Sequence, residues 1–211
     1  TKNVLVYLQD GKVNLAAPVA NSKANTITMQ GGKENVGIYT VTTDDKLTTA
    51  AKIDIDNSDN SIGLFAKSSA DVTNTGEISA TGKSVKAIIA NGSKVDSTGK
   101  ITVNGTALSA TDGSVGLASM DGGKLTQSGN TDITVEGSAS IGLYADGKYG
   151  IPAATATTLK VTGGTVTAKD GAFNTYAANS GTITLDGVTL NTEPKSLAFY
   201  TTDGGKINFT G

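Results

Sequence analysis

A short apolar motif centred on glycine recurs along the whole 211-residue chain. It is clearest at residues 140–145 (SIGLYA) and 61–66 (SIGLFA), and looser copies begin at Asn35 and Ser114. With the central position as marker, seven copies lie at residues 37, 63, 87, 116, 142, 172 and 198, in steps of 26, 24, 29, 26, 30 and 26. Self-similarity at such a period is typical of stacked-repeat proteins. The repeat therefore constrains the fold before any single motif does.

Each repeat contains three short segments in which apolar and polar residues alternate. The first is the motif itself, where a period of two predicts that Leu143 faces the interior together with Ile141 and Ala145. Gly142 and Tyr144 are then predicted to face outward. The second segment places an apolar residue after a lysine or another polar residue, and the third reads apolar-threonine-apolar. Glycine-containing turns separate the segments, so we expect three short strands per repeat.

Three strands in each period of about 27 residues predict an all-β fold, a right-handed parallel β-helix of about eight coils with the last incomplete. Each strand would pair with its equivalent one coil away, about 4.8 Å along the axis. Equivalent residues would then lie in columns. The predicted inward columns are Val36/Ile62/Val115/Ile141/Leu197, Ile38/Leu64/Ile88/Leu117/Leu143/Phe173/Phe199, Val13/Leu47/Val72/Val95/Leu125/Leu159/Ile183/Ile207 and Ile27/Ile53/Ile78/Ile101/Ile133/Val166/Val188.

We expect residues 1–211 to form one β-helical domain, because a single coil cannot bury enough apolar surface to fold alone. Thr1 stands where a complete chain would begin with Met, and neither a signal peptide nor a C-terminal β-barrel is visible. We therefore expect the chain to be a piece of a longer protein. Extra residues predict outward loops at 17–25, 104–113 and 146–153, and insertions in a solenoid are often placed where partners bind.

The composition excludes several kinds of chemistry. The chain has no His and no Cys, and all 17 basic residues are Lys. Disulfides, thiolate nucleophiles, imidazole bases and the usual zinc ligands are therefore absent from the sequence. A net charge of −2 does not favour nucleic acid as a partner. Asp54, Asp56 and Asp59 could serve a glycan-cleaving enzyme only if they cluster, and a solvated polar face is the favoured explanation. We expect no catalytic residue, no metal and no cofactor.

Aromatic residues predict an outward column that could contact a partner. Its members are Tyr39, Phe65, Tyr144 and Tyr200, with Ile89 between them and interruptions at Ala118 and Asn174. Exposed aromatic rings stack on sugars or bury in protein interfaces, but they also pack on one another. Together with Tyr149 and Ile151 in the inserted loop, Tyr144 and Phe65 are the predicted binding residues.

Residues 61–66 (SIGLFA), 74–79 (NTGEIS) and 97–102 (STGKIT) show the repeat pattern in full. This pattern resembles the passenger repeats of the autotransporter (type V secretion) adhesins of fusobacteria and their relatives. The resemblance covers most of the chain, and its motifs specify architecture rather than a ligand. It implies a passenger exposed on the cell surface, whose parent chain is anchored by an outer-membrane β-barrel. It also implies adherence to other microbes or to host cells. It does not assign a binding residue of the family to any position of this chain.

These observations lead to the expectation of a non-catalytic adhesin segment that serves as a stalk and as an interaction surface. Its partner would be a surface protein or glycan of another bacterium or of a host cell, and not a nucleic acid. Two alternatives stay open. One is a polysaccharide-active enzyme of β-helix shape. The other is a pure structural spacer within a larger surface protein.

Overall fold

The computed structural model describes residues 2–9, 14–15, 25–41, 46–147 and 156–210. Its strands form three parallel sheets. Sheet A contains β1 (Val4–Leu8), β4 (Val36–Thr40), β7 (Ile62–Lys67), β10 (Lys86–Asn91), β13 (Val115–Met120), β16 (Ile141–Asp146), β19 (Phe173–Ala178) and β22 (Leu197–Thr201). Sheet B contains β2 (Asn14–Leu15), β5 (Lys46–Thr49), β8 (Asp71–Asn74), β11 (Lys94–Ser97), β14 (Lys124–Gln127), β17 (Thr158–Thr162), β20 (Thr182–Asp186) and β23 (Lys206–Thr210). Sheet C contains β3 (Thr26–Gln30), β6 (Lys52–Asp56), β9 (Ile78–Lys83), β12 (Ile101–Thr106), β15 (Thr131–Glu136), β18 (Thr165–Lys169) and β21 (Thr189–Thr192).

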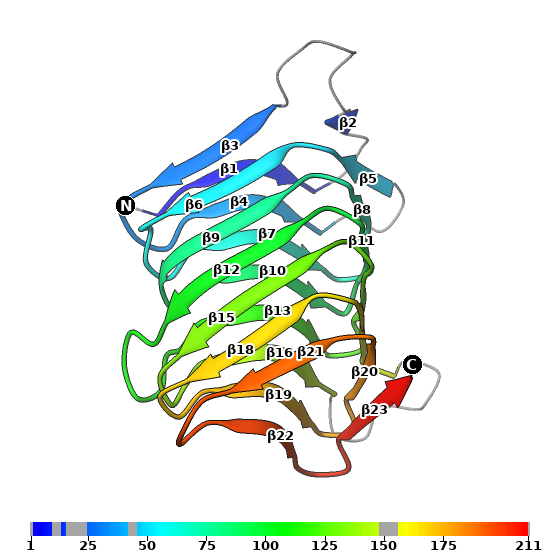
Figure 1. Cartoon of the computed structure of the whole chain (residues 1–211). Coiled ribbons are helices and arrows are strands. Elements are labelled where there is room, and N and C mark those ends of the chain that lie inside the picture. The colour runs from blue at the N-terminus through cyan, green and yellow to red at the C-terminus, as the bar shows by residue number, and fades with distance from the viewer. Residues whose placement is uncertain (1, 10–13, 16–24, 42–45, 148–155, 211) are drawn as a thin grey trace.

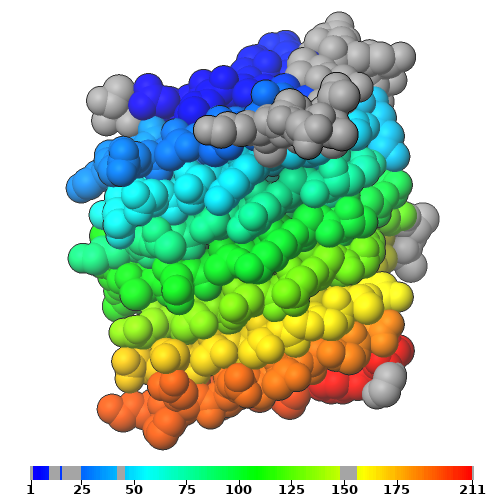
Figure 2. All heavy atoms as spheres, turned by 45° about the horizontal axis from the view of Figure 1, so that its top comes forward, coloured from blue at the N-terminus to red at the C-terminus, as the bar shows by residue number. Residues whose placement is uncertain are grey.

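The strands follow one another from sheet A to B to C, so the described residues make seven complete coils and the first two strands of an eighth. Descending from the N-terminus in Figure 1, the chain crosses the front from right to left and the back from left to right. That winding is right-handed, as expected for crossovers between parallel strands. Figure 2 shows the coils packed directly on one another as successive bands of colour. The predicted parallel β-helix is confirmed.

Within the described residues, no helix has the length and apolar character needed to cross a bilayer. The interior is instead filled by aliphatic side chains from all three sheets. On sheet B the predicted column is confirmed, since Leu47, Val72, Val95, Leu125, Leu159, Ile183 and Ile207 are cross-strand partners in that order. Val13, the first predicted member, lies outside the described residues.

On sheet C the inward face is predicted correctly, and the register is confirmed from Ile27 to Ile101 and between Ile133 and Val166. It is wrong at two steps. Ile101 pairs with Thr131 rather than with Ile133, because Ile133 pairs with Val103. Val166 likewise pairs with Leu190 rather than with Val188. Strand side chains alternate with a period of two, so a slip of two residues keeps a side chain on the same face. The repeated apolar-threonine-apolar pattern therefore fits either register equally well.

On sheet A the prediction of simple alternation is wrong at the glycine. Gly37 and Ile38 are consecutive and both buried, whereas Val36 and Tyr39 are partly exposed on the outside. A Cβ added to Gly37 would lie 3.1 Å from Ile53 Cγ2 on the opposite sheet, so this position faces the interior. The strand bends at the glycine, and alternation restarts after it.

This bend corrects two predictions. Ile141 was expected inside with Leu143, but it is partly exposed while Gly142 and Leu143 are buried. Phe173 was expected beneath Leu143, but it pairs with Ile141, and Thr175 takes the place beneath Leu143. The sixth copy of the motif is therefore centred on residue 174 and not on residue 172.

Buried serines join the coils at the corner between sheets C and A. The backbone N–H of Asn35 donates to Ser61 Oγ, that of Val85 to Ser114 Oγ, and that of Ser114 to Ser140 Oγ, each at 3.1 Å. The Ser114 hydroxyl in turn donates to the carbonyl oxygen of Thr106 at 2.8 Å. These contacts satisfy buried polar groups where the chain leaves one sheet for the next.

Candidate interaction face on sheet A

The outer face of sheet A carries two columns of side chains that flank the bend in each strand. The first column is Val4, Val36, Ile62, Lys86, Val115, Ile141, Phe173 and Leu197. The second is Tyr7, Tyr39, Phe65, Ile89, Ala118, Tyr144, Tyr176 and Tyr200. We call these sixteen residues the apolar strip. Lys86 is the sole charged residue among them.

Three aromatic rings pack in a row at the N-terminal end of the strip. The ring centroids of Tyr7 and Tyr39 are 5.4 Å apart and the rings are inclined by only 20°. Those of Tyr39 and Phe65 are 5.2 Å apart at 51°. Tyr7 is 54% exposed. The faces of Tyr7 and Tyr39 therefore pack on each other, whereas Phe65 is tilted against Tyr39.

A second aromatic cluster lies at the C-terminal end of the strip. Tyr144 and Tyr176 have ring centroids 5.5 Å apart, and those of Tyr176 and Tyr200 are 4.8 Å apart at an angle of 86°. Phe173 from the first column lies 5.8 Å from Tyr176 and 5.5 Å from Tyr200. The cluster thus joins both columns into one continuous apolar patch.

A carboxylate at the edge of this cluster orients one tyrosine. The Tyr144 hydroxyl donates to Asp146 Oδ2 at 2.7 Å, and Asn179 Nδ2 donates to Asp146 Oδ1 at 2.8 Å. Burial, reinforced by the hydrogen bond to Asp146, raises the pKa of Tyr144 above its ordinary value. Burial and the neighbouring Tyr200 likewise raise the pKa of Tyr176. Both phenols therefore remain neutral near pH 7.

The structure places two of the four predicted binding residues. Phe65 and Tyr144 do lie on one outer face, but Ile89 and Ala118 stand between them in the column. Three coil spacings separate the two rings by about 14 Å along the axis, so they do not contact each other. Tyr149 and Ile151 lie outside the described residues.

Sequence reasoning missed more than half of the strip. Six members of the first column were predicted to face inward: Val36, Ile62, Val115, Ile141, Phe173 and Leu197. In the second column Tyr7 was not included, and Tyr176 was overlooked because Asn174 was assigned to its place; Asn174 is instead fully buried. Lys86 was the available signal. It occupies the position of Ile62 and Val115, where an inward lysine would be buried without a partner at high cost. That position therefore had to face outward.

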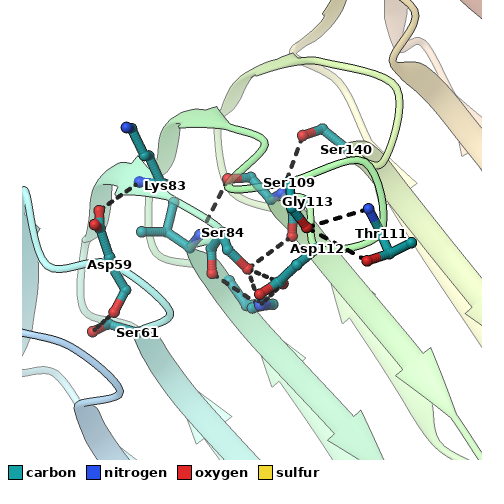
Figure 3. A network of polar contacts seen from close by, with 12 residues as sticks. Asp59, Ser61, Lys83, Ser84, Ser109, Thr111, Asp112, Gly113 and Ser140 are labelled. Carbon is teal, nitrogen blue, oxygen red and sulfur yellow. Dashed lines mark hydrogen bonds and ion pairs between the residues drawn. The ribbon is translucent and has the colours of Figure 1, made fainter.

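The charge of Lys86 is compensated within the chain. Lys86 Nζ donates to Ser84 Oγ at 2.6 Å and to the Ser84 carbonyl oxygen at 2.9 Å, and it lies 3.6 Å from Asp112 Oδ1. Burial lowers the pKa of Lys86, and the charge of Asp112 opposes that effect. Figure 3 shows Ser84 beside Asp112 and Gly113. Asp112, in the predicted insertion at 104–113 that follows β12, therefore contacts Lys86 of the strip.

Sheet B presents a different outer surface. Its cross-strand neighbours Lys46, Asp71, Lys94 and Lys124 form a charged outward column. Lys94 Nζ lies 2.7 Å from Asp96 Oδ2 and 3.8 Å from Asp71 Oδ1. Sheet C similarly carries Asp54, Asp132 and Glu136 on its outer face. The concentration of apolar outward residues therefore distinguishes sheet A from the other two faces.

Of the three carboxylates considered for catalysis, Asp56 and Asp59 line a shallow polar depression of about 620 Å³, and Asp54 does not. It is lined by Asp56, Asn57, Asp59, Thr81, Gly82, Lys83, Asn104 and Thr106. Asp59 accepts a hydrogen bond from the Lys83 backbone N–H at 3.1 Å, visible in Figure 3. Asp56 accepts hydrogen bonds from Asn57 Nδ2 at 2.9 Å and from Gln30 Nε2 at 3.3 Å. Both carboxylates thus hold adjoining turns and side chains in place.

Metal-ligating side chains do not gather in this region: across the described ranges, no three of His, Cys, Asp or Glu are close enough to share an ion. Comparison with protein-family models, with curated proteins and with solved structures gives no match to this chain. Its function must therefore be inferred from the β-solenoid and the chemistry of its surface.

Proposed function

We propose that this chain is a non-catalytic segment of a bacterial cell-surface adhesin of the autotransporter type, exposed outside the cell. The coils form a stalk, and the outer face of sheet A provides the surface that binds. The apolar strip is the observation that carries this proposal. Large contiguous apolar patches on a soluble surface mark interaction sites. The strip follows sheet A through the described coils, where most of its members are partly exposed and Ala118 is buried.

The fold supports the role of a stalk. Every internal strand of each sheet is hydrogen-bonded on both sides, and buried aliphatic residues run through the interior without interruption between coils. Such a solenoid gains stability from each neighbouring coil and presents an extended, ordered surface. The repeat motifs at 61–66, 74–79 and 97–102, which resemble those of autotransporter passengers, support the same assignment.

Adhesion of whole cells provides the test. The purified chain is added to bacteria that display the parent protein, and their attachment to other bacteria or to host cells is counted. We expect a dose-dependent loss of attachment. The variant Tyr144→Ser/Tyr176→Ser/Tyr200→Ser removes the C-terminal cluster and should lose this inhibition. A matched sheet C variant, Thr102→Ala/Thr134→Ala/Thr167→Ala, should retain it.

Two other outcomes would redirect the assignment. A folded parent chain that leaves attachment unchanged would support a pure spacer, with binding located elsewhere in the parent protein. Release of reducing ends from a panel of polysaccharides would support an enzyme, and loss of that release in Asp56→Asn/Asp59→Asn would place its chemistry in the polar depression. The separate variant Tyr149→Ala/Ile151→Ala tests whether the inserted loop binds the partner. Unchanged inhibition by this variant would exclude the loop from the binding surface.

A further inference from the structure

We propose that the C-terminal aromatic cluster of the strip, together with the carboxylates beside it, binds lysine and arginine side chains on a basic segment of a partner protein. The cluster consists of Tyr144, Phe173, Tyr176 and Tyr200. This inference rests on the proposed function, because it names the chemistry of the partner that the adhesive face binds.

Three aspartates lie along one side of this cluster, at the corner where the chain leaves sheet A for sheet B. Asp146 ends β16, Asp121 directly follows β13, and Asp203 lies two residues after β22. The coils are stacked closely at this corner. The Asp121 N–H donates to the Asp146 carbonyl oxygen, and the Ser180 N–H donates to the Asp203 carbonyl oxygen, each at 3.0 Å. Three of four successive coils therefore add a carboxylate to one corner, and we call these three residues the carboxylate row.

The carboxylate row is close enough to the aromatic cluster to influence its phenols. The Tyr144 hydroxyl donates directly to Asp146 Oδ2 at 2.7 Å. Burial is the main reason that the pKa of Tyr144 is raised, and the charges of Asp146 and Asp121 contribute to the rise. For Tyr176, burial and Tyr200 raise the pKa, and the charges of Asp146 and Asp203 add to their effect. Rings and carboxylates thus form one surface with a negative potential.

The negative charge of the row is not neutralised within the described part of the chain. No lysine there forms an ion pair with any of its three carboxylates, whereas Lys94 pairs with Asp96 and Lys169 pairs with Glu193. The side chains that donate to the row from the same corner are neutral: Asn91 Nδ2 to Asp121 (3.0 Å), Asn179 Nδ2 to Asp146 (2.8 Å) and the Thr202 hydroxyl to Asp203 (2.8 Å). Asp121 and Asp203 are exposed. A cation from outside can therefore approach the row.

Aromatic rings and uncompensated carboxylates attract the same kind of side chain. The face of an aromatic ring is negative and attracts lysine and arginine cations. The aliphatic stems of these residues cover apolar surface, while their charged ends can reach a carboxylate and form a strong hydrogen bond. Tyr200 is 41% exposed, at the end of the cluster closest along the chain to Asp203. A lysine or arginine at this place would meet both parts of the surface.

Other charged ligands fit this surface less well. A divalent metal ion is disfavoured, because in the described ranges no three acidic side chains are close enough to share it. Nucleic acids and choline headgroups of lipids carry phosphates, which the carboxylate row would repel. A neutral sugar would leave the charge of the row uncompensated. The combination of rings and carboxylates therefore favours a basic polypeptide.

Fluorescence anisotropy with the purified chain tests this partner. The probe is a labelled short peptide in which arginine alternates with glycine, and its matched counterpart has glutamine in place of arginine. We expect the arginine peptide to bind and the glutamine peptide not to bind. Raising the salt concentration from about 0.1 M to about 1 M shortens the screening length from about 10 Å to about 3 Å. Binding of the arginine peptide should weaken accordingly.

Two variants separate the carboxylate row from the rings. Asp121→Asn/Asp203→Asn removes two charges without changing side-chain size. Both positions have positive φ, 51° and 50°, which asparagine tolerates, so this variant should fold like the parent. Tyr176→Leu/Tyr200→Leu keeps an apolar surface but removes two ring faces. Each variant should weaken binding of the arginine peptide, and each lost ring contact should account for roughly two- to fivefold.

A charge-matched control on sheet C distinguishes the row from the general acidity of the chain, whose net charge is −2. Asp132 and Glu136 are exposed on the outer face of that sheet. Asp132→Asn/Glu136→Gln removes the same charge as the row variant and should bind the arginine peptide like the parent. Circular dichroism melts establish that all three variants fold.

Several results would overturn the proposal. Equal losses in the row variant and the sheet C control would show that the peptide responds only to net charge. Unchanged binding by the leucine variant would remove the rings from the site. Co-sedimentation with phosphatidylcholine vesicles that the leucine variant abolishes would assign the surface to a lipid headgroup instead of a protein.

The basic partner and the adhesin can fail independently. A parent chain that does not bind the arginine peptide but still blocks cell attachment would overturn the basic partner and leave the adhesin intact. Conversely, peptide binding at this surface without any inhibition of attachment would contradict the adhesin and support the cation site.

Discussion

The bend in sheet A makes a sharp prediction about Leu143 and Ile141, two residues apart on β16. Simple alternation puts both inside, whereas the structure buries Leu143 completely and leaves Ile141 partly exposed. Leu143→Ala should remove a side chain packed in the interior and cost about 2–5 kcal/mol, through lost transfer free energy and a cavity. Ile141→Ala should cost less than about 1 kcal/mol, because surface changes have small effects.

Thermal unfolding monitored by circular dichroism distinguishes the two cases. For a chain of this size, each kcal/mol lowers the melting temperature by roughly 2–4 °C. Leu143→Ala should therefore melt about 4–20 °C below the parent, and Ile141→Ala within about 4 °C of it. Leu143→Asp should fall further, since it would bury an uncompensated carboxylate. Equal losses for the two alanine variants would show that alternation continues through Gly142 and would refute the bend.

Three further predictions probe the interior and the strip. Gly142→Val should destabilise the fold by about 1–3 kcal/mol in urea melts, because even a Cβ there would lie 2.4 Å from Val166 Cγ1; an unchanged midpoint would place Gly142 outside. Ser114→Ala should cost about 1–3 kcal/mol, since it leaves the Val85 N–H without its buried acceptor; hydrogen exchange at that amide should accelerate. The raised pKa of Tyr144 means that the unfolded chain loses this phenolic proton first as pH rises above about 10. Stability from this group should therefore be full below pH 10 and decline above it, and Tyr144→Phe should lessen the decline in melting temperature. An identical decline in that variant would count against the shift.

Asp56 and Asp59 show how much of a site can be predicted from residue type alone. The sequence places Asp56 and Asp59 close together, and both do reach one depression. The hydrogen bonds from Gln30 to Asp56 and from the Lys83 backbone to Asp59 depend on neighbouring coils. Such partners come from residues about 25 positions away in the chain, so only the packed solenoid brings them together.

From the sequence alone, the stacked coils, the three parallel sheets and the inward faces of sheets B and C could be predicted. These features follow from alternation within a few neighbouring residues, which the order of amino acids displays directly. Leu125 and Ile133 are inward on that ground, and both are buried.

The register between coils and the bend at Gly142 were decided by the tertiary structure. Both depend on how one coil packs against the next, where turn lengths and contacts across the interior select among pairings that local alternation cannot separate. The apolar strip follows from these choices, because Ile141 and Tyr144 share the outer face only when the strand bends between them. The surface that we propose as the binding face was therefore not evident in a sequence that displays its core plainly.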